Sequence, residues 1–185
     1  MSKLEANTIA PSTGTTLTIG ESGDTVTLGS GASLSGFGVN TPAFHAYLSA
    51  SQTGVTSNTA TKVTLDTTLV DTDSAFASNK FTVPSGGAGK YYLYGALTGV
   101  ASATSRLNVA AVKIYVNGSQ LFQAYGNYDG NFPYSAVKNT YGITTLAVGD
   151  YVELYGQVED STAANVTFSG GASASTFLGG YKIIE

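Results

Sequence analysis

The side chains that could carry out chemistry are few in this sequence. His45 is the single histidine and the chain has no cysteine, which excludes a thiolate nucleophile and nearly excludes a zinc site. His45 stands between Phe44 and Ala46, with no acidic residue beside it. This setting favours a packed or surface histidine over a general base, so we expect no catalytic residue and no cofactor.

Paired carboxylates could cleave a glycosidic bond. The candidates are Asp129, Asp150, Glu153, Glu159 and Asp160. A Gly-Asp turn explains Asp150, Glu159 and Asp160 fall in an expected loop, and no pair stands out. Asp71 and Asp73 offer the hard oxygen ligands that calcium takes, but two carboxylates are far short of a site, and a solvated turn is favoured. We therefore expect no metal site and no enzyme.

The composition narrows the class of protein further. Hydrophobic residues make up 42% of the 185 residues, but charged residues only 11%, against about a quarter in typical globular proteins. A surface covered by uncharged polar groups suits a protein that sits among copies of itself. The net charge is -4 with no basic stripe, and no run of about 18 apolar residues occurs. We expect neither nucleic-acid binding nor a membrane span.

The apolar residues recur with a period of two almost throughout, which predicts an all-β protein. Asn117-Gly118 is the strongest two-residue hairpin signal. Strands at this spacing predict a sandwich or a jelly roll. The candidate strands cover residues 44–49, 61–65, 80–83, 91–97, 109–116, 120–125, 136–146, 151–158 and 176–184.

The first 40 residues differ from the rest, because they are dense in Thr, Ser and Gly and hold no tyrosine. Three short units at 16–20, 25–29 and 32–36 alternate apolar and hydroxyl residues and end in glycine. We interpret residues 1–40 as an attachment segment and 41–185 as the head domain; a flexible linker is the alternative for the segment. The apolar residues that need a docking surface are Leu17, Ile19, Val26, Leu28 and Leu34.

Ordered motifs run through residues 44–181. They are Phe44-x-Ala46, Phe81-x-x-Pro84, Gly89-Lys90-Tyr91-Tyr92-Leu93-Tyr94, Asn117-Gly118, Leu146-x-x-Gly149-Asp150-x-Val152 and Phe177-x-Gly179. This set resembles the globular head of the first complement component, within the tumour-necrosis-factor-like jelly rolls. The resemblance implies a jelly-roll sandwich that assembles as a homotrimer around a threefold axis, burying aromatic faces.

The strand around Tyr91–Tyr94 has large groups on both faces, and only one face can meet the core of its own chain. We expect Tyr92 and Tyr94 at a trimer interface, although half-exposed tyrosines are the alternative. Residues 8–28 are similar to leaders of structural proteins from tailed bacteriophages, which implies a virion protein. With no signal core at Met1–Glu5, we expect synthesis in the host cytoplasm and release by lysis to the virion surface.

The stretch 125–134 is the richest candidate for binding, because aromatic rings, amides and a carboxylate stand together with Gly and Pro. Such a mixture suits contact with carbohydrate or protein, and packing beneath the loop or between subunits is an equal alternative. The candidate residues are Tyr125, Asn127, Tyr128, Asp129, Asn131, Phe132 and Tyr134.

These observations favour a non-enzymatic, trimeric phage surface protein. The first hypothesis is a capsid decoration protein that docks on the major capsid protein or another virion protein through its N-terminal segment. The alternatives are a short head or tail fibre whose tip contacts host-surface carbohydrate, and a free lectin-like module.

Overall fold

The computed structural model describes residues 9, 13–15, 18–25, 27, 30, 40–173 and 175–183. The chain divides into two units, Met1–Phe37 and Gly38–Glu185. In the first unit, every described residue is exposed and none lies in a helix or strand. Of the predicted docking residues, Ile19 is exposed, whereas Leu17, Val26, Leu28 and Leu34 lie outside the described residues.

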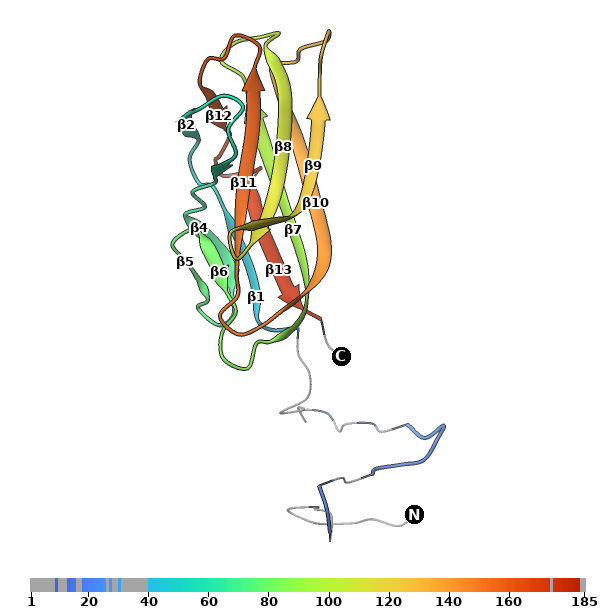
Figure 1. Cartoon of the computed structure of the whole chain (residues 1–185). Coiled ribbons are helices and arrows are strands. Elements are labelled where there is room, and N and C mark those ends of the chain that lie inside the picture. Colours follow the sequence, from blue (N-terminus) through green and yellow to red (C-terminus); the bar gives the residue numbers. More distant parts are fainter. Residues whose placement is uncertain are drawn as a thin grey trace. The chain divides into compact units, whose positions relative to one another are not determined.

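Two antiparallel sheets make up the second unit (Figure 1). The first sheet runs β2 (Gln52–Val55), β12 (Val166–Phe168), β7 (Gly89–Val100), β13 (Phe177–Lys182), β1 (Ala43–Tyr47) and β4 (Thr67–Asp71), and β10 (Ser135–Leu146) also pairs with β7. The second sheet runs β5 (Phe76–Ala77), β6 (Lys80–Thr82), β11 (Tyr151–Asp160), β8 (Leu107–Val116) and β9 (Ser119–Asn127), and β3 (Thr61–Lys62) pairs with β11.

The order of the main strands is that of a jelly roll. Four of them, β1, β13, β7 and β10, lie side by side in the first sheet, and β6, β11, β8 and β9 do so in the second. The chain passes repeatedly from one sheet to the other, so that neighbours within a sheet are often far apart in the sequence, as β1 and β13 are. Within the described residues there is no helix. The predicted all-β jelly roll is confirmed.

The core lies between the two sheets and follows from the alternation of side chains along each strand. Tyr91, Leu93 and Leu97 of β7 point into it and are fully buried. Phe44 of β1 stacks on Phe81 of β6, with ring centroids 4.1 Å apart, and so links the sheets. Burying an aromatic ring of this size contributes roughly 1.5–3 kcal/mol.

Each of the nine predicted strand segments contains a strand, but four short strands were missed. They are β2, β4, β5 and β12, of which none exceeds five residues. Strands this short leave little room for a period-two pattern, and Gly54 interrupts β2 with a positive φ of 71°. The Asn117-Gly118 turn is confirmed, because φ is 51° and 76° at its two residues, as a type I′ hairpin requires.

Candidate interaction surfaces

The outward side of the first sheet is rich in aromatic rings. In β7, Tyr91 and Leu93 face the core, so Tyr92 and Tyr94 face away from it. Tyr92 lies 6.0 Å from Tyr94, measured between ring centroids. The sequence could not decide which side of this strand points outward, and the structure places the two predicted interface residues there together.

Neighbouring strands extend this surface on both sides. Tyr181 of β13 and Tyr141 of β10 lie 5.6 Å and 6.3 Å from Tyr92. His45 of β1 stacks on Phe177 of β13 at 5.0 Å, and Phe177 meets Tyr94 edge-on at 6.1 Å. We call this set the aromatic face: His45, Tyr92, Tyr94, Tyr141, Phe177 and Tyr181.

The aromatic face is continued along β10 by apolar side chains that are largely exposed. Tyr141 is 68% exposed, and Val137 and Ile143 on the same side of β10 are 57% and 59% exposed. Gly179 lies under Tyr94, where a Cβ atom would collide with the ring. The glycine of the Phe177-x-Gly179 motif therefore lets an aromatic ring lie flat on the sheet.

His45 is part of this packing. Its Nδ1 lies 3.1 Å from the Tyr94 hydroxyl, and its ring packs against Phe177. Burial lowers the pKa of His45 below its usual value. Burial, with smaller contributions from Tyr181 and Tyr92, raises the pKa of Tyr94. Both groups are held in their neutral forms, which suits close contact with other apolar groups.

The stretch 125–134 divides between a strand and a loop. Tyr125 and Asn127 lie on β9, so the loop begins later than expected. Tyr125 and Tyr134 are half-exposed, at 52% and 49%. The backbone carbonyl of Tyr134 accepts a hydrogen bond of 2.9 Å from the amide of Ala101, which anchors the far end of the loop.

The other predicted residues of this stretch are partly engaged within the head. Tyr128 packs against the core, and the Lys138 ammonium lies 5.1 Å from its ring centroid. Asp129 accepts a hydrogen bond of 3.0 Å from Asn127. Phe132 is half-buried and Asn131 is exposed. The groups free to meet a partner are therefore chiefly Tyr125, Asn131 and Tyr134.

Two of the acidic candidates, Asp160 and Asp71, have structural roles. Asp160 is buried and accepts four hydrogen bonds from the amides and hydroxyls of Ser102 and Thr162, at 2.6–2.9 Å. Burial alone would raise its pKa, but these bonds outweigh burial and hold the pKa well below its usual value. Asp71 ends β4 and accepts the amides of Ala75 and Phe76. Sequence patterns did not reveal Ser102 as a partner of Asp160, since 58 residues separate the two in the chain.

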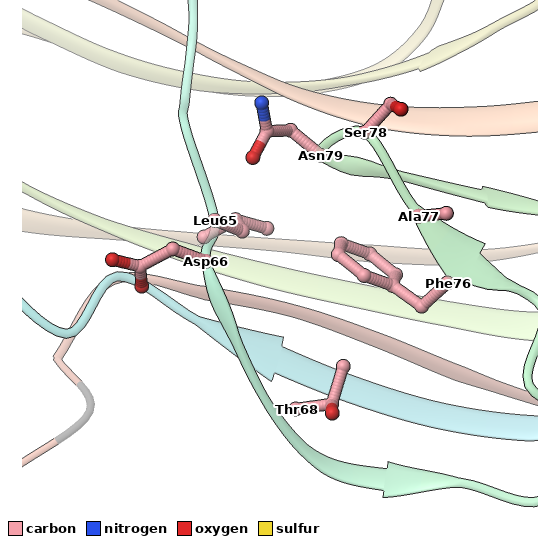
Figure 2. Close-up of a pocket in the computed structure, with 7 residues that line it drawn as sticks. All are labelled: Leu65, Asp66, Thr68, Phe76, Ala77, Ser78 and Asn79. Carbon is pink, nitrogen blue, oxygen red and sulfur yellow. The ribbon is translucent and has the colours of Figure 1, made fainter.

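A cleft that the sequence did not reveal lies between two sheet edges (Figure 2). Its walls are the segment 65–68, which leads into β4, and the hairpin 76–79, which contains β5. The volume of this open cleft is about 270 Å³. The sequence signal available here was the Ser78-Asn79 pair, which is a weak turn signal on its own.

Within the described part of the chain, no group of three or more His, Asp or Glu side chains could hold a metal ion. The same part contains no helix long and apolar enough to cross a membrane.

The comparisons with known proteins add a resemblance in fold. The globular domain of a zebrafish complement 1qA protein is similar to this chain in structure. The sequence identity is 19% and the TM-score 0.47, over 77% of this chain and 97% of that chain. The assignment of the jelly roll rests on the strand order. No protein-family model and no curated protein matches the sequence.

Proposed function

We propose that this protein is a non-enzymatic virion surface protein whose head domains associate as a homotrimer through the aromatic face. The observation that carries the trimer is the aromatic face itself, continued by Val137 and Ile143. Contiguous exposed apolar surface on a sheet is typical of a protein–protein contact.

The position of the aromatic face supports association between copies. It lies on the outward side of four neighbouring strands of the first sheet, β1, β13, β7 and β10, so a partner would cover ring surfaces from all four. Aromatic side chains are enriched in the buried centres of interfaces. In a second copy of this chain, the matching surface is the same neutral aromatic face. Contact between the two faces therefore buries no unpaired charge.

The virion role is supported by features of the sequence. Few charges, no cysteine and a hydroxyl-rich segment before the head fit a particle protein, and residues 8–28 are similar to leaders of phage structural proteins. In this proposal residues 1–40 attach the protein to the major capsid protein or another virion protein, as a capsid decoration protein, and the head is exposed.

Light scattering on the purified full chain tests the trimer. We expect a mass of three times 18.9 kDa. A stable monomer across a wide concentration range would overturn the trimeric assembly.

Deleting residues 1–36 tests the attachment role separately. We expect a folded, trimeric head that no longer binds the particle, and attachment that survives the deletion would exclude the docking role. Labelling the protein on intact particles and counting its copies distinguishes a capsid location from a tail location.

The alternative is a fibre tip or a lectin-like module that contacts host carbohydrate through the loop that follows β9. The observation that favours it is the exposure of Tyr125 and Tyr134. Replacing Tyr134 with Ala should weaken binding to host cells without lowering the melting temperature. Tyr128 is the matched contrast, because its ring packs against the core and its removal should lower stability.

A further inference from the structure

The cleft between β4 and β5 has the lining of a small binding site (Figure 2). Its volume of about 270 Å³ falls just under the roughly 300–1,000 Å³ of sites for drug-sized ligands. A single ring-sized group is therefore the appropriate occupant. β4 and β5 stand at the ends of their sheets, so the cleft opens at the side of the sandwich opposite β9.

The apolar part of the lining is one flat ring with small neighbours. Phe76 lies in the cleft beside Leu65 and Ala77 (Figure 2). The Phe76 ring also stacks on Phe44, with centroids 6.0 Å apart, which fixes its orientation from the core side. A fixed aromatic ring presents a platform for the C–H face of a saturated ring.

Polar groups with spare hydrogen-bonding capacity surround that platform. Asn79, Ser78 and Thr68 line the cleft. Their side chains make no hydrogen bond to any other described residue. A side-chain amide and a hydroxyl can each donate and accept hydrogen bonds. The Asn79 amide and the two hydroxyls together therefore suit a ligand with several hydroxyl groups.

The turn that carries Asn79 is held in place. Ser78 and Asn79 both have left-handed backbones, with φ of 53° and 59°, a conformation that is costly for serine. The Lys62 ammonium donates to the Ser78 carbonyl at 3.1 Å and to Glu153 at 2.6 Å. Strained residues held by their surroundings are common at ligand sites.

The cleft offers a ligand no free charge. The Asp66 side chain turns away from Phe76 (Figure 2), and its carboxylate accepts the amide and hydroxyl of Ser49 at 2.9 Å and 2.8 Å. The Lys62 ammonium is already engaged by Ser78 and Glu153. An uncharged ligand is therefore favoured over an anion or a cation.

We propose that this cleft binds one neutral pyranose ring, with its C–H face on Phe76 and its hydroxyls on Asn79, Ser78 and Thr68. The proposal goes beyond the virion role, since it requires neither the trimer nor the attachment segment. It also places carbohydrate at a surface different from the loop after β9.

The experiment titrates the full-length, ¹⁵N-labelled protein with the methyl α-glycosides of mannose, glucose and galactose. We expect at least one of them to shift the Asn79 side-chain amide and the backbone amides of 65–68 and 76–79. No shift with any of the three would overturn the proposal. Shifts confined to Tyr125 and Tyr134 would also overturn it, while supporting the lectin-like alternative.

Two glycine substitutions, each at a residue whose backbone φ is positive, make the test more specific. Asn79→Gly removes the amide but suits the left-handed backbone, so the fold is kept. We expect about tenfold weaker binding, the effect of one lost hydrogen-bonding group. Ser105→Gly is the matched control, because Ser105 also has a positive φ, of 58°, outside the cleft, and should bind as the parent does. Equal affinities for all three proteins would overturn the role of Asn79 and with it the proposal.

Discussion

The side-chain amide of Asn117 donates a hydrogen bond of 2.8 Å to the carboxylate of Asp150, 33 residues further along the chain. The Asn117 side-chain oxygen in turn accepts the amide of Tyr151 at 3.0 Å. Asp150 also accepts the amide of Ala147 at 2.7 Å. Two turns that stand apart in the sequence are thereby joined at one end of the second sheet.

Replacing Asn117 with Ala should destabilise the head by about 2–3 kcal/mol, because it removes both side-chain bonds and leaves Ala in a left-handed turn. Asn117→Gly keeps the turn conformation and loses only the bonds, so we expect about 1–2 kcal/mol. Urea unfolding of the two variants measures both values. If Asn117→Gly is as stable as the parent, the link to Asp150 contributes nothing.

Asp160 should make stability depend on acid pH. Its pKa in the folded state lies below the unfolded value of 3.8, so the folded state favours the ionised form. Its contribution is fully present above the unfolded pKa and is lost as pH falls from there through the folded pKa. Replacing Asp160 with Asn should lower the free energy of unfolding by about 2 kcal/mol at neutral pH. The free energy of unfolding of this variant should also depend less steeply on pH in the acid range.

Asp129→Asn is the control for this comparison, since Asp129 is exposed and its side chain accepts a hydrogen bond from Asn127, two residues away at the end of β9. Its stability should match that of the parent at every pH. If the free energy of unfolding of Asp160→Asn falls in acid as steeply as that of the parent, other carboxyl groups cause the pH dependence.

His45 should link the aromatic face to pH. Burial holds its folded-state pKa below the ordinary value of 6.5, so protonation opposes packing against Phe177. Stability, and trimer association in our proposal, should be fully present above about pH 6.5 and fall as pH drops through the folded pKa. Melting curves and mass measurements between about pH 7.5 and about pH 5 detect the loss.

The matched variant is His45→Phe, which keeps a ring on Phe177 and cannot titrate. Its melting temperature should show no step in this range. An unchanged step would mean that other groups cause it.

Tyr141→Lys and Ile143→Lys should weaken association about tenfold or more, because each places an unpaired ammonium group in the proposed interface. Both side chains are exposed in the isolated head, at 68% and 59%, so the fold should be unaffected. Val148→Lys changes a residue that is 54% exposed in the turn after β10 and serves as the control. Analytical ultracentrifugation compares the three, and equal association would place the interface elsewhere.

The sequence by itself determined the all-β class, most strand positions and the type I′ turn at Asn117-Gly118. These features depend on local rules: a period of two sets a strand, and a positive φ at two successive residues calls for Asn and Gly. The ordered motifs added the jelly roll through resemblance.

Only the tertiary structure decided which side of each strand faces inward. Tyr91 and Tyr92 are the same residue type on opposite sides of β7, and alternation alone does not say which side meets the other sheet. The packing of Leu93 and Phe44 against Gly180 from one side, and the ring of Tyr94 over Gly179 from the other, settle it.

The cleft and the buried Asp160 lay beyond the sequence for a related reason. The cleft forms where β4 and the hairpin of β5 and β6 approach each other from different sheets, and Asp160 meets Ser102 across 58 residues. Such contacts depend on how distant segments pair, which short-range patterns do not encode. Composition and periodicity set the kind of surface this protein has, and the strand order set where its aromatic face and its cleft lie.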